Sequence, residues 1–433
     1  MEKNNKKIIN AWSMYDWANS VYSLVITATI FPIYYNAVTS NDSNNNLVDF
    51  FGWSIENTAL YSYSISFSFI IIAIIAPPLS GVADYGGKRK LLWQIFAYLG
   101  ASACIALFFF TDSIAYGIIC SVLASIGFAG SLVFYNAYLP SIATPDKFDQ
   151  VSAKGFSMGY AGSILLLIVS LILIQKHEFW GFEDNIFPTR LSFLLTGVWW
   201  FGFSTIPFSV IPPNKSTGKQ KSNLFSKGFE EINKVLKSLP SNPDLGKFLL
   251  SFFLYNTGVQ TIIYLATLFG SAELQLESGE LILTILIIQV VAIAGAYLFA
   301  FVSKKKGNKY SLVVMIILWV MVCIAAYFVM SAIHFYALAF LVGLVMGGIQ
   351  SLSRATYSKL IPENTLDHTS YFSFFDVTEK ISIVIGTIVY GVMIQITGGM
   401  RLSSVALSIF FIAGLVVLLQ THIPYQQTNK TNI

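Results

Sequence analysis

Long apolar runs, each interrupted by only a few charged residues, constrain this chain more than any other feature of its sequence. A helix that crosses a hydrocarbon core about 30 Å thick needs about 20 mostly apolar residues. Twelve runs meet that length and are bounded by charged, Gly or Pro residues. We predict twelve membrane-spanning helices, at 11–38, 58–80, 91–110, 114–139, 154–175, 190–211, 247–270, 280–302, 310–330, 335–358, 370–396 and 402–421.

Composition excludes several other classes of protein. Hydrophobic residues make up 55% of the 433 residues and charged residues only 11%, which is too little polar surface for a water-soluble globule. Cys104, Cys120 and Cys323 lie inside apolar runs, and the four histidines lack ligand spacing. We therefore expect an integral membrane protein without a metal or other cofactor, and neither catalytic residues nor a nucleotide-binding glycine loop is indicated.

The distribution of basic residues predicts the orientation. Most lysines and arginines lie in the connections on the side of the N-terminus, whereas the opposite side carries Lys176, Arg190 and Arg401. Cytoplasmic loops are the ones enriched in Lys and Arg. We expect both termini in the cytoplasm of a multi-pass protein of the plasma membrane, which is the inner membrane in a Gram-negative cell. The net charge of +4 then reflects topology, not nucleic-acid binding.

Weak internal repetition divides the chain into two halves. Tyr15-Asp16-Trp17-Ala18 parallels Tyr255-Asn256-Thr257-Gly258, and the turn around Pro145 parallels the turn around Pro362. Both copies begin on the same side of the membrane, so the halves are related in parallel. We predict a six-helix half at 1–211, a cytoplasmic linker at 212–246 and a second six-helix half at 247–433.

Charged side chains inside the predicted spans mark the candidate site. Arg354, Asp376, Glu379 and Lys380 lie in or against apolar segments, where such groups normally face a bundle interior or a wet cavity. With a rise of about 1.5 Å per residue, Lys380 lies roughly 15 Å into its helix, near the middle of the membrane. The same estimate allows Arg354 to pair with Asp376. Gly343, Gly347 and Gly348 are expected to permit close helix packing.

The loop 80–90 reads Ser-Gly-Val-Ala-Asp-Tyr-Gly-Gly-Lys-Arg-Lys and resembles the signature loop of the major facilitator superfamily. Ser80 replaces the usual first glycine, and Tyr85 replaces the usual basic residue. The corresponding loop of the second half, 303–309, lacks the acid. We expect Asp84 to meet the positive N-terminal end of the helix near 368–370. The gate residues implied here are Asp84, Lys88, Arg89 and Arg354.

Four further segments, around 12–22, 255–261, 350–357 and 374–380, resemble the "unknown major facilitator" family. That family includes the autophagy-related vacuolar amino-acid effluxers of fungi. The resemblance reaches across the whole chain and implies the twelve-helix major facilitator fold and a secondary transporter. Thr257 stands where we expect an acid from this resemblance.

The function we predict is alternating-access transport of a small polar solute, with amino acids favoured by the resemblance and protons as a candidate coupling ion. We expect a monomer in the lipid bilayer. Residues expected to bind the solute are Asn19, Asn256, Gln260, Tyr264 and Lys380. Residues expected to couple or carry protons are Asp16, Asp376 and Glu379.

Several alternatives remain open at this point. Lys380 either recognises an anionic part of the solute or is neutralised by Asp376 and Glu379 within one helical turn. Arg354 is either a structural partner or part of a gate. Export of amphipathic or toxic compounds, and a membrane sensor that keeps the fold without transporting, are the two rival functions.

Overall fold

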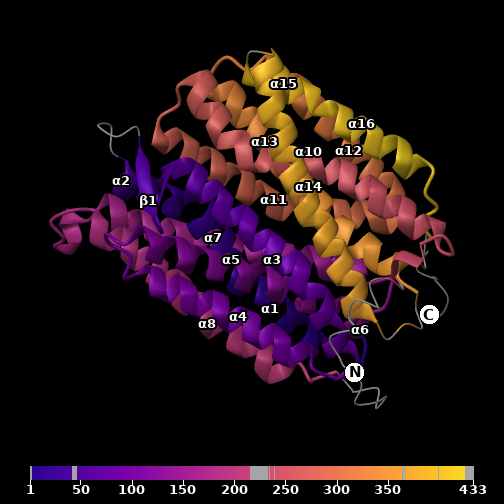
Figure 1. The fold of residues 1–433 in the computed structure, drawn as a ribbon. Coiled ribbons are helices and arrows are strands. Elements are labelled where there is room, and N and C mark those ends of the chain that lie inside the picture. The colour runs from indigo at the N-terminus through magenta and orange to yellow at the C-terminus, as the bar shows by residue number, and fades with distance from the viewer. Residues whose placement is uncertain are drawn as a thin grey trace. The chain divides into compact units, whose positions relative to one another are not determined.

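The chain folds almost entirely into helices. The computed structural model describes residues 2–40, 46–214, 233, 235–237, 239–362, 365, 367–397 and 399–424. Within this part of the chain, twelve helical segments are long and apolar enough to cross a membrane. Each corresponds to one predicted run, so the all-α prediction with twelve spans is confirmed (Figure 1).

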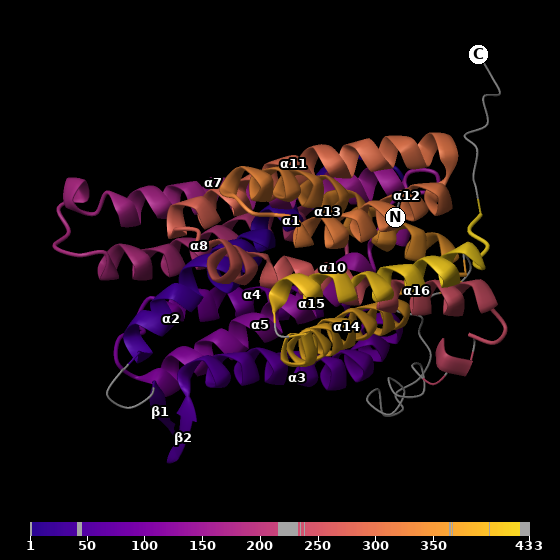
Figure 2. The same ribbon diagram turned by 90° about the horizontal axis from the view of Figure 1, so that it is seen from above.

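The first six spans are formed by α1 (Lys6–Val21) with η1 (Tyr22–Ile30) and α2 (Phe31–Thr39), α3 (Asn57–Tyr85), α4 (Arg89–Leu107), α5 (Ile114–Asn136), α7 (Phe148–Gln175) and α8 (Ile186–Val210). Three short elements lie between them: α6 (Leu139–Ile142), the 3-10 helix η3 (Glu178–Trp180), and a hairpin of β1 (Leu47–Phe50) and β2 (Trp53–Glu56). The two strands pair antiparallel, and Figure 2 shows the hairpin projecting beside α2 and α3.

The last six spans are formed by α10 (Pro243–Leu274), α11 (Ser278–Lys306), α12 (Asn308–Tyr327), α13 (Ala332–Leu360), α14 (His368–Thr397) and α15 (Met400–Ala406) with α16 (Ser408–Leu419). Most of the predicted linker 212–246 lies outside the described residues.

The first span changes its hydrogen-bonding pattern in the middle. Residues Tyr22–Ile30 form a π-helix, and the Thr29 hydroxyl donates to the Leu24 carbonyl at 2.6 Å. The π-helix ends at Ile30, two residues before Pro32, which has no amide proton to donate to the preceding turn. Such π-helical segments frequently lie at functional sites.

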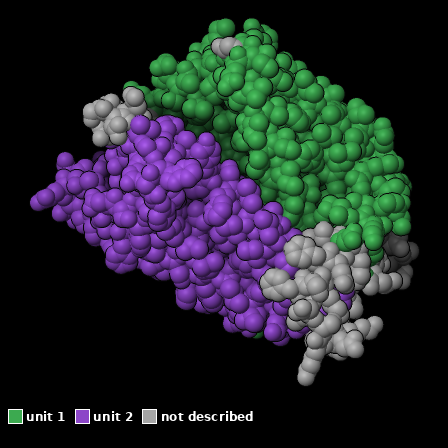
Figure 3. Space-filling view, viewed as in Figure 1, with its two compact units in different colours: residues 1–9, 136–160, 230–433 green, residues 10–135, 161–229 purple. Residues whose placement is uncertain are grey.

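Contacts divide the structure into two compact units that cut across the predicted halves (Figure 3). One unit contains residues 1–9, 136–160 and 230–433, and the other contains 10–135 and 161–229. The beginning of α7 therefore packs with the later helices, for reasons that its side chains make clear below. The division into halves at 1–211 and 247–433 stays a prediction.

Glycines allow α11 and α13 to approach one another closely. A Cβ atom on Gly347 would lie 2.0 Å from the Ala292 carbonyl oxygen, and one on Gly295 would lie 2.1 Å from the Leu344 carbonyl oxygen. No larger residue fits at such distances without moving a backbone. The predicted role of Gly343 and Gly347 in close packing is therefore confirmed.

Candidate functional site

Three charged side chains of α14 form a buried cluster. The Lys380 ammonium nitrogen lies 3.5 Å from Asp376 Oδ1 and 3.6 Å from Glu379 Oε2. The Asp376 and Lys380 side chains are 4% and 8% exposed, whereas the Glu379 side chain is 28% exposed. Lys380 thus has two carboxylates within ion-pair distance, and its contact with the solute stays a prediction.

The polar side chains of α10 face this cluster, and the two helices pack side by side (Figure 1). Gln260 Nε2 lies 3.4 Å from both Glu379 Oε1 and Asn256 Oδ1, and Asn256 Nδ2 donates to the Ser382 hydroxyl at 2.6 Å. Spacing of i and i+4 places Asn256 and Gln260 on one side of α10. The structure therefore brings these two predicted residues together with the charged cluster. Tyr264, one turn further along, is 40% exposed.

In the other unit, Asp16 lies on α1 and is 5% exposed. Its Oδ2 atom accepts a hydrogen bond of 2.6 Å from the Tyr135 hydroxyl of α5. The Trp12 ring stacks on the Tyr135 ring with centroids 4.4 Å apart. This stacking holds the Tyr135 hydroxyl in position to donate to Asp16. Asn19 is 1% exposed, and its side-chain Nδ2 has no hydrogen-bond partner. Such a buried and unused donor is uncommon in proteins.

The signature loop is held by a buried ion pair. Arg89 Nη2 lies 2.8 Å from Asp84 Oδ1, and both side chains are less than 5% exposed. Asn214 closes the loop, because it donates to the Ala83 carbonyl and accepts from the Arg89 amide. Lys88 is exposed. The predicted approach of Asp84 to residues 368–370 stays a prediction.

The predicted pair of Arg354 and Asp376 is wrong. Arg354 instead donates to the Ser152 hydroxyl at 2.9 Å, the Ser152 carbonyl at 3.0 Å and Asn136 Oδ1 at 3.1 Å. Its guanidinium also lies 4.3 Å from the ring centroid of Phe156. The beginning of α7 supplies Ser152 and Phe156, and the end of α5 supplies Asn136. Asp376 finds a cation one turn along its own helix.

Asp149, which sequence reasoning missed, forms a second buried polar cluster. Its carboxylate accepts hydrogen bonds from the Ser303 hydroxyl, from Asn308 Nδ2 at 2.8 Å and from Lys359 Nζ at 2.8 Å. Lys359 also donates to Asn308 Oδ1 at 2.7 Å. The loop 303–309 lacks the acid that the loop 80–90 carries, and Asp149 on α7 supplies a carboxylate beside it instead. The missing acid was therefore the sequence signal that could have led to Asp149. These bonds explain why the beginning of α7 belongs with the later helices.

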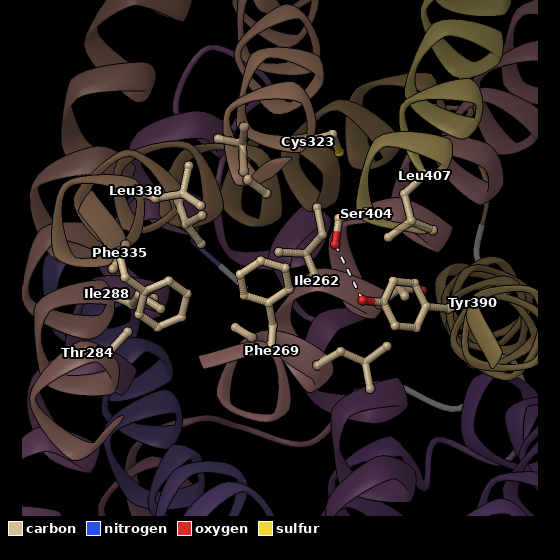
Figure 4. Close-up of a pocket in the computed structure, with 17 residues that line it drawn as sticks. Ile262, Phe269, Thr284, Ile288, Cys323, Phe335, Leu338, Tyr390, Ser404 and Leu407 are labelled. Carbon is tan, nitrogen blue, oxygen red and sulfur yellow. Dashed lines mark hydrogen bonds between the residues drawn. The ribbon is translucent and has the colours of Figure 1, made fainter. Parts of the chain in front are cut away.

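An apolar cavity lies within the later helices, apart from both charged clusters. Figure 4 shows Ile262 and Phe269 of α10, Ile288 of α11 and Leu338 of α13 around it. One end of the lining is polar, where the Tyr390 and Ser404 hydroxyl oxygens lie 3.3 Å apart. No residue predicted from the sequence to bind the solute lines this cavity.

Comparison with known proteins adds independent evidence. The chain matches the family described as "Vacuole effluxer Atg22 like" over residues 4–430. It is 31% identical to the uncharacterized MFS-type transporter YxiO of Bacillus subtilis over 96% of this chain and 95% of that protein. It is 24% identical to autophagy-related protein 22 of Saccharomyces cerevisiae, with 88% of this chain and 81% of that protein covered.

Solved structures agree on the fold. The proton:xylose symporter XylE superposes with a TM-score of 0.73 at 14% identity, covering 97% of this chain and 96% of that one. The fucose:proton symporter FucP of E. coli gives a TM-score of 0.69 at 13% identity, covering 96% and 98%. The predicted major facilitator fold is thereby confirmed, and this fold and family are those of transporters, which are not enzymes. The chain is a multi-pass membrane protein of the major facilitator superfamily and belongs to the Atg22-like vacuole effluxer family.

Proposed function

We propose that this protein is a secondary transporter that moves a small polar solute by alternating access, with amino acids as the favoured class of solute. The observation that carries the proposal is the alignment of Asn256 and Gln260 on α10 with Asp376, Glu379 and Lys380 on α14. Charged and amide groups are expensive inside a membrane and are usually kept there because they meet a solute or an ion. Amide, ammonium and carboxylate groups together can bind both charges of a zwitterion.

Proton coupling is part of the same proposal. Asp16, Asp376 and Glu379 are carboxylates within spanning helices, and the first two are buried. XylE and FucP, which share the fold, are proton symporters by their descriptions. Tyr135 holds Asp16 in place through its hydroxyl group, which suits a group that gains and loses a proton without moving.

The proposed location is the plasma membrane, with both termini in the cytoplasm and the protein acting as a monomer. The distribution of Lys and Arg between the two sets of loops supports this orientation. All three native cysteines are buried, so an impermeant thiol reagent is expected to leave them unlabelled. Added to intact cells, this reagent should label Ser54→Cys and leave Lys305→Cys unlabelled. The reverse pattern would overturn the orientation.

Counterflow in proteoliposomes tests the transport proposal. Vesicles preloaded with a mixture of unlabelled amino acids should accumulate a labelled amino acid transiently when they contain the protein. Gln260→Ala should reduce the initial rate at least tenfold, because its amide links the two helices of the site. Glu273→Gln serves as the matched control, since Glu273 pairs with Arg401 at 2.9 Å away from the site. Absence of counterflow with every amino acid would contradict amino-acid transport.

Export of amphipathic compounds is the second candidate, and the apolar cavity favours it. Its lining is mostly hydrocarbon with one polar end at Tyr390 and Ser404, which matches an amphipathic ligand. Cells that produce the protein should then retain less ethidium than cells with an empty vector, and Ala339→Trp should abolish the difference by filling the cavity. A sensor without transport would show neither counterflow nor altered dye retention.

A further inference from the structure

The hairpin of β1 and β2 has one apolar face and one polar face. Residues directly opposite each other in antiparallel strands point to the same side of the sheet, and successive residues alternate between sides. Four apolar residues share one side, in two opposite pairs: Val48 with Ile55, and Phe50 with Trp53. The other side has Asp49 opposite Ser54, and both of these residues are exposed. The hairpin is therefore amphipathic, although it lies outside the core of the protein.

The described part of the chain covers only the base of this apolar face. Val48, near the base, is 5% exposed, whereas Trp53, next to the turn, is 73% exposed. Phe51, at the tip, is also 73% exposed. Its φ of +53° and that of Gly52, +82°, lie in the left-handed region, where turns of this kind usually carry Asn, Asp or Gly. A bulky aromatic residue is uncommon in that conformation, and here it stands at the outermost point of the hairpin.

The hairpin lies at the level of the lipid headgroups. It leads directly into α3, whose 29 residues span about 43 Å, which exceeds a hydrocarbon core about 30 Å thick. Along α3, an exposed apolar stripe with helical spacing begins at Tyr63 and continues through Phe67 and Ile70. Figure 2 shows the hairpin projecting sideways, across the direction of α3 and not beyond its end. The uncovered aromatic tip thus extends over the lipid beside α3.

The base of the hairpin is tied to the end of the first span. Asn57 directly follows β2 and is 1% exposed. Its Nδ2 atom donates to Asn36 Oδ1 at 3.1 Å and to Thr39 Oγ1 at 2.9 Å, both on α2. The Tyr35 hydroxyl of α2 donates to the Asn57 carbonyl at 3.1 Å. Whatever holds the hairpin therefore also holds this end of α2.

We propose that the hairpin is an interfacial anchor whose partner is the surface of the bilayer. Phe51 and Trp53 enter the headgroup layer, where aromatic side chains are favoured, and the polar face stays in water. The charged residues within 46–57 are Asp49 and Glu56, and both are acidic. The anchor therefore suits a zwitterionic surface such as phosphatidylcholine and is repelled by anionic lipid. It fixes the adjoining end of the first span at the membrane surface.

Spin labels on single cysteines measure the depth of each face. The purified protein is labelled at Trp53→Cys or at Ser54→Cys and placed in phosphatidylcholine nanodiscs that hold one copy each. The three native cysteines are buried, and the chain without an added cysteine gives the background signal. The ratio of collisions with oxygen to collisions with a neutral nickel chelate should be several-fold higher at Trp53→Cys than at Ser54→Cys. Equal, low ratios at the two positions would place the tip in water and overturn the proposal.

Removing the aromatic tip tests the anchor itself. In the Ser54→Cys protein, Phe51→Ser together with Trp53→Ser should narrow the spectrum of the label, because the hairpin then moves freely. Phe179→Ser, at a residue that is 80% exposed in another loop, is the matched control and should leave the spectrum unchanged. An unchanged spectrum in the double variant would contradict anchoring. Immobilisation that occurs only in discs holding two copies would make a second copy the partner and would also overturn the proposal.

The charge of the lipid gives a further test of the chosen partner. In nanodiscs of phosphatidylglycerol, the label at Trp53→Cys should lie closer to water, with a lower ratio of oxygen to nickel collisions than in phosphatidylcholine. Asp49→Asn together with Glu56→Gln should abolish this difference between the lipids, because both acidic groups are then neutral. A deeper position in phosphatidylglycerol would contradict the preference for a zwitterionic surface.

Discussion

Two buried aspartates in the same compact unit have opposite surroundings. Asp149 accepts hydrogen bonds from a hydroxyl, an amide and an ammonium group, all at close distance. Asp376 has one lysine at 3.5 Å, which it shares with Glu379, and one oxygen atom with no partner. Burial is similar, at 5% and 3% exposure, so burial alone does not tell the two apart.

The difference teaches how to separate structural acids from ligand-binding acids inside a membrane protein. A saturated carboxylate joins elements: Asp149 ties the beginning of α7 to Ser303 on α11 and to Lys359 on α13. The Asp376 carboxylate, by contrast, has one oxygen atom without a hydrogen-bond partner and joins no second helix in the same way. We therefore expect the Asp149 cluster to stabilise the fold, whereas solute or ion binding at the Asp376 cluster is our proposal.

The largest effect is expected from Lys359→Met. Removing one partner of a buried ion pair leaves the other charge uncompensated, which costs about 3–5 kcal/mol. The measurement is unfolding of the detergent-solubilised protein with increasing SDS, followed by tryptophan fluorescence. Lys306→Met, at an exposed lysine of the same face of the membrane, should stay within about 0.5 kcal/mol of the native protein. Equal losses of unfolding free energy in Lys359→Met and Lys306→Met would contradict the structural role of the Asp149 cluster.

Lys380→Met should cost less, about 2 kcal/mol, although it also removes a buried lysine. Its nitrogen lies 3.5 and 3.6 Å from the two carboxylates, so less stabilisation is lost with it than with Lys359, which lies 2.8 Å from Asp149. Both variants are measured in the same unfolding experiment. A loss for Lys380→Met as large as that for Lys359→Met would contradict the difference between the two clusters.

Ser303→Ala should have a smaller effect than either lysine substitution, about 1.5 kcal/mol, because Asp149 keeps its bonds to Asn308 and Lys359. Thermal melting in detergent is sensitive enough to detect it. Ser271→Ala on the exposed face of α10 is the control and should melt with the native protein. If Ser303→Ala lost as much stability as Lys359→Met, removing one hydrogen bond would abolish the contribution of the whole Asp149 cluster.

The parts of the structure that depend on local sequence were predictable. Apolar length located the twelve spans found in the described part of the chain, and i, i+4 spacing put Asn256 and Gln260 on one side of α10. The charged stretch of α14 was also predictable, since Asp376 and Lys380 are themselves four residues apart. In each case the partners are close in sequence, or the pattern repeats along one helix.

The parts that depend on distant partners were not predictable. Asp149 meets Ser303 and Lys359, which are 154 and 210 residues away in sequence, and by itself it looks like an ordinary acid in the first turn of a helix. Arg354 was assigned to Asp376 from depth alone. Depth along the membrane does not say which helices are neighbours, and Ser152 on α7 is the actual partner.

The most direct test of the central claim compares Asp149→Asn with Asp376→Asn in one unfolding experiment. Both substitutions keep the shape of the side chain and remove its charge. Asp149→Asn should cost about 3 kcal/mol, because Lys359 loses its counterion, whereas Asp376→Asn should change stability by less than about 1 kcal/mol, because it removes an uncompensated charge. Equal losses in the two variants would contradict the account, since Asp376 would then be as well satisfied as Asp149.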